Sequence, residues 1–294
     1  PPRSTLFPYT TLFRSAIPMM TGRFTSRPVE DLVKETRYLA SRGVKELLLI
    51  AQELSSYGRD LYGHSRLPEL VEAITEIEGI EWIRLHYFYP SDFPYDILRI
   101  MREKKKVVPY LDLPLQHISD HMLKRMRRHT TRRETEQLLQ TVRAEVPGVA
   151  LRTTLLVGYP GETEEDFREL LQFVEDQRFD RLGVFTYSHE EGTYAFNKYS
   201  DEVPEEIKQQ RASLIMERQE QISAELNEDK VGLKLHVIID RREGDYYVGR
   251  TRFDSPEVDG EVYVTSEREL SPGDFVRVRM TGADTHDLFG ILES

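Results

Sequence analysis

The stretch RTTLLVGYPGETEEDF, residues 152–167, could bind a ligand through backbone N–H groups. Its first part, 153–157, is β-branched and apolar without polar alternation, which is typical of a parallel strand buried on both faces. Three residues then break the strand: Gly158, Pro160 and Gly161. Thr163 and the acidic residues after it predict a helix start. This βα unit is common in α/β proteins and identifies no function by itself.

A histidine follows another predicted strand in the run QHISD, residues 116–120. His117 could act as a general base or a metal ligand. No second histidine or carboxylate stands at ligand spacing from it, so a polar contact within the loop is favoured.

Two further groups each allow two interpretations. Tyr87, Phe88 and Tyr89 could stack on an adenine ring, although aromatic residues at a strand end usually belong to the core. Six basic residues could grip phosphates, but without interleaved aromatic residues they favour a solvated surface: Lys124, Arg125, Arg127, Arg128, Arg132 and Arg133.

The elements that must position these residues alternate between strands and helices. Strands are predicted at residues 46–51, 82–87, 111–115, 151–157 and 182–187, and helices at 67–78, 95–103, 119–128, 132–146 and 163–178. Such alternation predicts parallel strands joined by right-handed crossovers, in a barrel or an open wound sheet. In both, ligands bind at the C-terminal strand ends, where polar residues cluster in this sequence.

The last part of the chain has a different pattern. A long helix is predicted over residues 204–230, with an inward face made by Ile207, Leu214, Ile215, Ile222 and Leu226. Short β runs at 234–240, 245–250, 261–264 and 275–280, punctuated by glycine and proline, predict a small antiparallel barrel. We place a domain boundary near residue 231, between domains 16–230 and 231–294. Residues 1–15, PPRSTLFPYTTLFRS, resemble a translated sequencing adapter and are expected to be foreign or disordered.

Composition limits the possible functions. The 294 residues are 39% hydrophobic, enough for a core, and the net charge of -11 is compatible with a basic partner. No apolar run is long enough for a membrane span or a signal core, so a cytoplasmic protein is expected. The absence of cysteine excludes disulfides, thiolate zinc sites and cysteine-ligated iron-sulfur clusters in the chain as given.

Several phrases together resemble the radical SAM methylthiotransferases over residues 16–294: AIPMMTGR, RLHYFYP, LPLQHISDHMLKRMRRHTT, RTTLLVGYPGETEEDF, FDRLGVFTYSHEEGTYA and YYVGRTRFDSPEVDGEV. QHISD with FDSPEVDGEV resembles the branch that methylthiolates the β-carbon of an aspartate in the small-subunit ribosomal protein number twelve. The resemblance implies a partial (β/α) radical SAM barrel lacking its first strand, followed by a TRAM β-barrel. It also implies S-adenosyl-L-methionine (SAM) and two 4Fe-4S clusters as cofactors.

The cluster motif departs from this family. The family places CxxxCxxC directly before Ala16, and Ser15 occupies the position of the third cysteine. Three soft thiolate ligands have no ready substitute, so the resemblance implies an N-terminally truncated enzyme that is inactive as written and holds no metal. The alternatives are a tRNA-modifying sibling, or a non-catalytic module that binds a ribosomal protein or RNA.

The resemblance also implies a SAM pocket, with catalytic residues unassigned. Its residues would be Gln52, Gln116, Arg152, Gly158, Glu162 and Tyr187. Within it, Arg152 is expected to pair with the SAM carboxylate and Gln116 with ribose hydroxyls. Gly158 would permit close backbone approach.

The tail suggests the substrate class. Residues 231–294 contain eight Lys or Arg and thirteen Asp or Glu, a net charge of -5 that repels phosphate and makes RNA the less favoured partner. We expect the full-length form to be a monomer, and we expect the tail to attract a basic ribosomal protein through salt-sensitive contacts. The candidate residues are Asp254, Glu257, Asp259 and Glu261; the alternative is a solubilising surface.

Overall fold

A parallel sheet forms the first part of the fold in the computed structural model, which describes residues 24–293. Its strands are β1 (Glu46–Leu49), β2 (Trp82–Leu85), β3 (Val107–Gln116), β4 (Ala150–Val157) and β5 (Arg181–Thr186). They pair in the order β1-β2-β3-β4-β5, all parallel, as predicted. Within the described residues the sheet stays open between β1 and β5. The predicted foreign segment, 1–15, lies outside the described residues.

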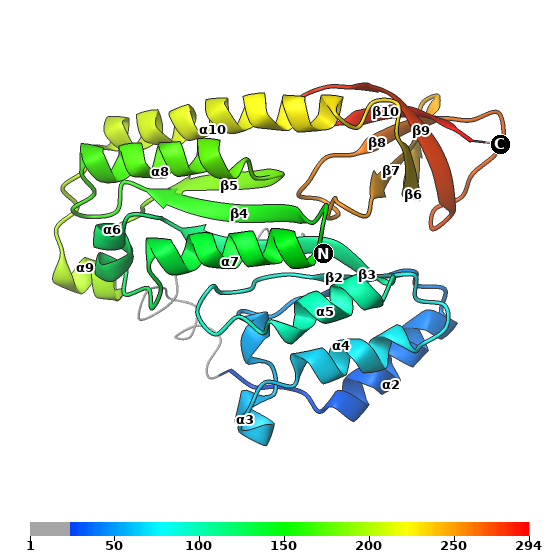
Figure 1. Ribbon diagram of the computed structural model, residues 1–294, viewed down its shortest axis with the longest axis horizontal. Coiled ribbons are helices and arrows are strands. Elements are labelled where there is room, and N and C mark those ends of the chain that lie inside the picture. Colours follow the sequence, from blue (N-terminus) through cyan, green and yellow to red (C-terminus); the bar gives the residue numbers. More distant parts are fainter. Residues whose placement is uncertain (1–23, 294) are drawn as a thin grey trace.

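Successive right-handed crossovers in one direction place the helices on one face of the sheet, as in a barrel. The connecting helices are α2 (Val29–Ser41), α4 (Leu67–Thr75), α5 (Asp96–Glu103), α7 (Arg132–Glu145) and α8 (Glu164–Gln177) (Figure 1). Apolar strand residues facing them, such as Leu47, Ile83 and Leu155, form one buried core with the helices. Short elements lie near the C-terminal strand ends: η1 (Leu54–Ser56), α3 (Arg59–Tyr62), α6 (Asp120–Arg125) and α9 (Tyr194–Lys198). No helix of residues 24–293 is long and apolar enough to cross a membrane.

A long helix, α10 (Glu205–Glu228), lies along β5 and α8 and leads to the tail (Figure 1). The inward face predicted for it is partly wrong, because Ile207 and Leu214 are among the exposed apolar side chains. Ile215 and Ile222 are buried as predicted, but the buried stripe also contains polar residues: Lys208, Arg211, Gln219, Ser223 and Asn227. Hydrophobic periodicity missed this stripe because its polar members are buried by specific hydrogen bonds and ion pairs.

The tail is a closed barrel in the order β10-β8-β7-β6-β9. Its strands are β6 (Lys234–Glu243), β7 (Tyr246–Thr251), β8 (Val262–Thr265), β9 (Phe275–Ala283) and β10 (Leu288–Leu292). The predicted barrel is confirmed, but β10 was not predicted and pairs with β8 in parallel, so the barrel is not wholly antiparallel. Closure leaves no edge strand exposed within it.

The tail packs against the N-terminal ends of the sheet strands. Trp82 of β2 meets the ring of Phe275 of β9 edge-on, with centroids 4.9 Å apart. Around this contact, Val108, Tyr110 and Ile238 form a buried apolar cluster to which both parts contribute. The two parts therefore share a core.

Candidate functional site

The C-terminal ends of the five strands bring most of the predicted cofactor residues to one edge of the sheet. Gln116 is the last residue of β3, Gly158 follows β4 and Tyr187 follows β5. Gln52 lies just beyond β1, and Glu162 lies in the loop before α8. Arg152 differs, because it lies near the start of β4.

His117 holds the loop beside it and the loop after β4. Its Nδ1 accepts hydrogen bonds from the backbone N–H groups of Ile118 (2.9 Å) and Ser119 (3.0 Å). The proton must then reside on Nε2, which lies 3.1 Å from Glu162 Oε1 and donates to it. With both nitrogens engaged and the ring fully buried, the geometry favours the polar loop contact over a base or metal ligand.

The other carboxylate oxygen of Glu162 also holds the loop after β4, and together His117, Glu162 and Arg211 form a clamp on that loop. Glu162 Oε2 accepts from the Gly158 N–H at 2.6 Å and pairs with Arg211 Nη1 of α10 at 2.5 Å. Gly158 has φ +75°, and a Cβ there would lie 2.3 Å from Lys208 Cγ. The loop shape therefore depends on glycine and on two charged side chains of α10 that the sequence analysis did not identify.

Two glutamines at this edge have features of a ligand site. Gln52 Nε2 is buried and has no hydrogen-bond partner in the described part of the chain. An unsatisfied buried donor costs about 1–3 kcal/mol, so a ligand oxygen would stabilise it. Gln116 has φ +71°, and Tyr87, two residues after the end of β2, has φ +61°. These conformations cost energy in residues other than glycine and are frequent at functional sites.

Tyr187 closes the edge on the β5 side. Its hydroxyl lies 2.9 Å from His189 Nδ1, and its ring meets Tyr159 with centroids 5.1 Å apart. Burial, with smaller contributions from Asp201 and Glu190, raises the pKa of Tyr187 to about 12. The phenol is therefore neutral at pH 7 and serves as a hydrogen-bonding group.

The guanidinium of Arg152 points away from this edge and toward the tail. Its Nη1 lies 3.1 Å from Asp112 Oδ1, and its Nε lies 3.5 Å from Asp259 Oδ1. Burial alone would lower the pKa of Arg152, but these carboxylates outweigh it and raise the pKa above its ordinary value. The expected pairing with a SAM carboxylate stays a prediction, and it would require Arg152 to leave both partners.

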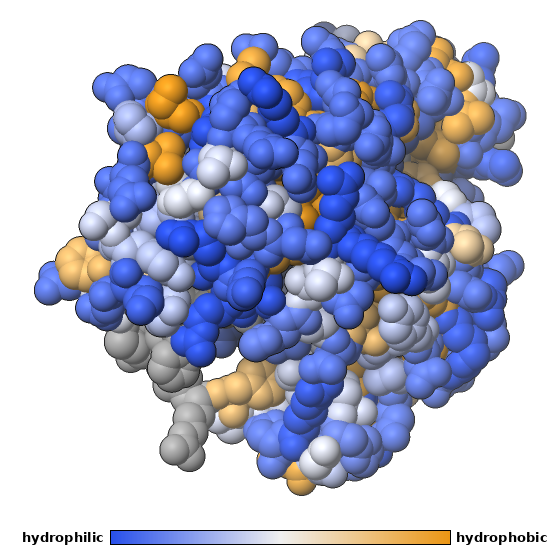
Figure 2. All heavy atoms as spheres, turned by 60° about the vertical axis from the view of Figure 1, so that its left-hand side comes forward, coloured by the Kyte–Doolittle hydropathy of each residue, from blue (hydrophilic) through white to orange (hydrophobic). Residues whose placement is uncertain are grey.

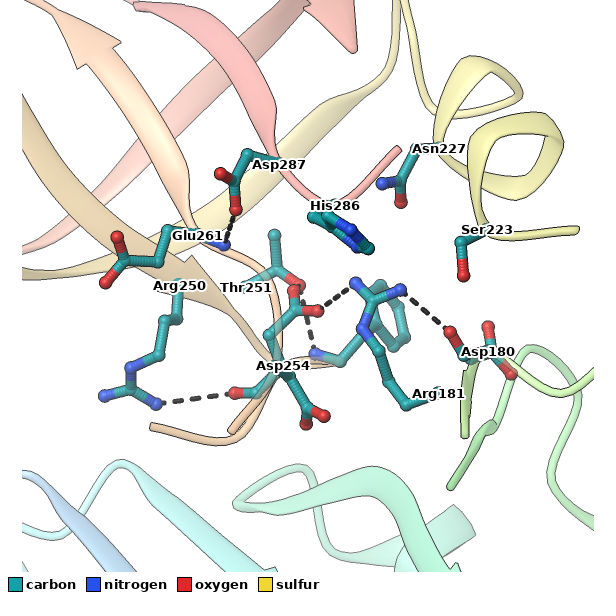
Figure 3. Close-up of polar contacts among 12 residues, drawn as sticks. Asp180, Arg181, Ser223, Asn227, Arg250, Thr251, Asp254, Glu261, His286 and Asp287 are labelled. Carbon is teal, nitrogen blue, oxygen red and sulfur yellow. Dashed lines mark hydrogen bonds and ion pairs between the residues drawn. The ribbon is translucent and has the colours of Figure 1, made fainter. Parts of the chain in front are cut away.

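The tail carboxylates proposed for substrate contact fall into two groups. Asp254 is 2% exposed and lies 2.5 Å from Arg181 Nη2, a contact visible in Figure 3. Asp259 accepts a hydrogen bond from Tyr110 at 2.8 Å. Asp254 and Asp259 thus serve as counter-charges for the sheet. Glu257 is exposed and accessible to a partner, whereas Glu261 is half-buried and both of its carboxylate oxygens pair with Arg241.

Burial and charge shift the pKa values of the two buried carboxylates in opposite directions. Burial would raise the pKa of Asp254, but Arg181, Lys230 and a hydrogen bond from Thr251 lower it below its ordinary value. For Asp259, burial prevails and raises the pKa. Asp254 is therefore the more firmly ionised of the two at neutral pH.

The donors present do not fit an iron-sulfur cluster. The chain has no cysteine, and residues 24–293 contain no group of three His, Asp or Glu side chains placed to hold a metal ion. Oxygen and nitrogen donors are poor substitutes for the thiolates that hold such clusters. The orphaned amide of Gln52 fits an organic ligand with polar groups, such as SAM.

Comparisons with known proteins place the chain in a wider context. Residues 8–174 match the Radical SAM superfamily and residues 231–292 match the TRAM domain. "Ribosomal protein uS12 methylthiotransferase RimO" of Parabacteroides distasonis is 56% identical over 275 residues, covering 94% of this chain and 64% of that protein. The protein of the same name from Bacteroides fragilis is 58% identical, with the same coverage.

The chain thus spans about two thirds of the length of these relatives. Among solved structures, coproporphyrinogen III oxidase (HemN) from Escherichia coli aligns with a TM-score of 0.46 and 20% identity, covering 66% of this chain and 46% of that chain.

Proposed function

This chain belongs to the radical SAM superfamily and carries a TRAM domain, and from that premise we propose that it is the barrel-and-tail part of a methylthiotransferase. Its proposed reaction adds a methylthio group to the β-carbon of an aspartate in ribosomal protein uS12, in the cytoplasm. The observation that carries the proposal is the 56–58% identity, over 94% of the chain, to proteins named for that activity.

The residues at the C-terminal edge support a SAM site. The His117–Glu162–Arg211 clamp fixes the loop after β4, and the amide of Gln52 offers a buried donor to a ligand oxygen. The side chain of Gln116 would orient the ribose from the end of β3. Bound SAM supplies the methyl group and, with a reduced cluster, a radical. The chain as given has no cysteine thiolate to hold that cluster.

The absence of cysteine also leads to an expectation for SAM binding. A cluster would anchor the methionine end of SAM, so this chain retains only contacts to the adenosine end. We expect weak or no SAM binding by calorimetry, and the small affinity that remains should fall further in Gln52→Leu. Micromolar binding would contradict this account of the site.

Charge supports a protein substrate. The net charge of the tail is -5, and its exposed carboxylate Glu257 would attract a basic protein. A basic tail would favour the alternative, a tRNA-modifying enzyme, but the tail of this sequence is acidic.

The test compares binding of purified uS12 with that of another small-subunit ribosomal protein of similar size and charge. The proposal expects tighter uS12 binding that weakens with salt and with Glu257→Gln. Equal affinity for both proteins would refute the uS12 assignment. Tighter binding of tRNA than of unrelated RNA of equal length would favour the alternative.

A further inference from the structure

The basic run at α6 lies on an aromatic surface that the sequence did not reveal. Residues 121–133 include six Lys or Arg and no Asp or Glu, in a chain whose net charge is -11. Figure 2 brings the end of the molecule with α6 and α9 forward and shows a mostly hydrophilic surface with scattered apolar areas.

Three arginines of this run stack on tyrosines from other parts of the chain. The guanidinium carbon lies 4.2 Å from the ring centroid for Arg125 on Tyr199, 4.7 Å for Arg127 on Tyr194, and 5.2 Å for Arg128 on Tyr89. Stacking on an aromatic ring fixes the plane of a guanidinium, and guanidinium groups can bind phosphate in a bidentate manner. The tyrosine and guanidinium planes also suit stacking by bases.

The backbone of Arg127 makes this arginine suitable for substitution. The end of α6 forms a Schellman turn, in which Arg128 N–H donates to Leu123 O (2.8 Å) and Arg127 N–H to Lys124 O (3.0 Å). Arg127 occupies the left-handed position of this turn, with φ +57°, where glycine is usual. Glycine at position 127 would therefore remove the guanidinium and relieve the backbone at the same time.

This surface is continuous with the candidate site. Arg125 Nε donates to Pro160 O at 2.9 Å, in the loop clamped by Glu162. Tyr89, beneath Arg128, follows the end of β2. A polymer that lies across α6 and α9 would therefore pass beside the C-terminal edge of the sheet.

We propose that the α6–α9 surface, made by Lys124, Arg125, Arg127, Arg128, Tyr194 and Tyr199, binds RNA. The identification of that RNA as the one bound to the substrate rests on the proposed function, because a ribosomal protein is assembled on RNA. The acidic tail would meet the protein while α6 and α9 hold the neighbouring phosphates and bases. Sequence-independent contact is expected, since stacking and phosphate pairing do not read base edges.

The test measures binding of a fluorescein-labelled oligouridine of about twenty nucleotides to the full chain between about 50 and 200 mM salt. Arg127→Gly removes the guanidinium and relieves the backbone, so its unfolding midpoint should not fall. Each phosphate contact contributes about 0.7 to the slope of log affinity against log salt for single strands, so the slope should decrease by about 0.7. At about 0.1 M salt, one decade below the 1 M reference concentration, a decrease of about 0.7 in the slope corresponds to about a fivefold loss of affinity.

The matched control is Arg178→Gly. Arg178 ends α8 with φ +46°, also in the left-handed region, and pairs with Glu225 at a largely exposed site. It undergoes the same change of residue and charge, and it should leave RNA affinity and salt slope unchanged. Equal effects of the two substitutions, or no RNA binding by the unsubstituted chain at 50 mM salt, would overturn the proposal.

Two further probes separate the possible outcomes. Polyglutamate or anionic phosphatidylserine vesicles bound as tightly as RNA would refute an RNA partner in favour of a general anion-binding surface. Loss of uS12 preference with RNA binding intact would refute the proposed function and leave the RNA surface standing. Intact uS12 preference without RNA binding would refute the RNA surface and leave the proposed function standing.

Discussion

Substituting Asp254 by Asn tests how the tail is held to the sheet. Asp254 is 2% exposed and lies 2.5 Å from Arg181, whose side chain is also largely buried. The substitution keeps the shape of the side chain but leaves the guanidinium without its closest counter-charge. Removing one partner of a buried ion pair typically costs about 3–5 kcal/mol, and we expect the free energy of unfolding to fall by that amount.

Trp82 provides the assay. It is the single tryptophan, is 6% exposed, and contacts Phe275 of the tail. Separation of tail and sheet should therefore shift its emission to longer wavelength during urea unfolding at pH 7. Glu257→Gln is the matched control, since it removes one negative charge from the same loop at an exposed position. A loss for Asp254→Asn within about 1 kcal/mol of the control would refute the assigned role of the pair.

The pH dependence provides a second check on Asp254. Its folded-state pKa is lowered, so its contribution is fully present above the ordinary carboxyl pKa of about 3.9 and is lost as pH falls through the folded value. The difference in stability between the unsubstituted chain and Asp254→Asn should stay constant from pH 7 to about 5. It should narrow below about pH 4, and a difference that grows on acidification would contradict the sign of the shift.

Three further substitutions give contrasting expectations. Asp259→Asn should cost less than Asp254→Asn at pH 7, because burial raises the pKa of Asp259; urea unfolding should show the variant gaining relative to the unsubstituted chain as pH rises above about 3.9, until the raised folded pKa is passed. Gly158→Ala should lose more stability in thermal unfolding than Gly148→Ala, which pays about 1 kcal/mol for the same left-handed backbone but has nothing within 4 Å of the new Cβ. Asp166→Asn should weaken the cap of α8 by about 1–2 kcal/mol at neutral pH, and urea titrations should show this loss begin to shrink below about pH 4, since hydrogen bonds outweigh burial and lower the pKa of Asp166.

Periodicity and turn residues predicted the parallel sheet because each signal is local. The run 153–157 lies within β4, and the capping box of Thr163 and Asp166 begins α8 where expected. Element ends differed by a few residues, as usual. β10 was missed because Leu288–Leu292 is short and its strand partners, β8 and β9, cannot be found from local pattern.

The site was less predictable, since its polar groups pair across long sequence separations. Asp254 was interpreted as a surface carboxylate, but Arg181, 73 residues earlier, neutralises it inside the protein. The aromatic partners of the α6 arginines were also missed, because Tyr194 and Tyr199 lie more than sixty residues further along the chain. The amino-acid composition around a residue does not show which distant side chains contact it in the folded protein.

The ion pairs between sheet and tail also bear on how such proteins can evolve. Arg152 and Arg181 of the sheet obtain counter-charges from Asp259 and Asp254 of the tail, and Arg84 donates to the carbonyl of Arg252. Recombination that joined this sheet to an unrelated tail would bury arginines without acids to neutralise them. The two parts match separate families, yet a viable exchange must transfer the tail together with the strand residues that it neutralises. Covariation between residues of the sheet and residues of the tail, rather than within either part, should therefore show that the two parts evolved together.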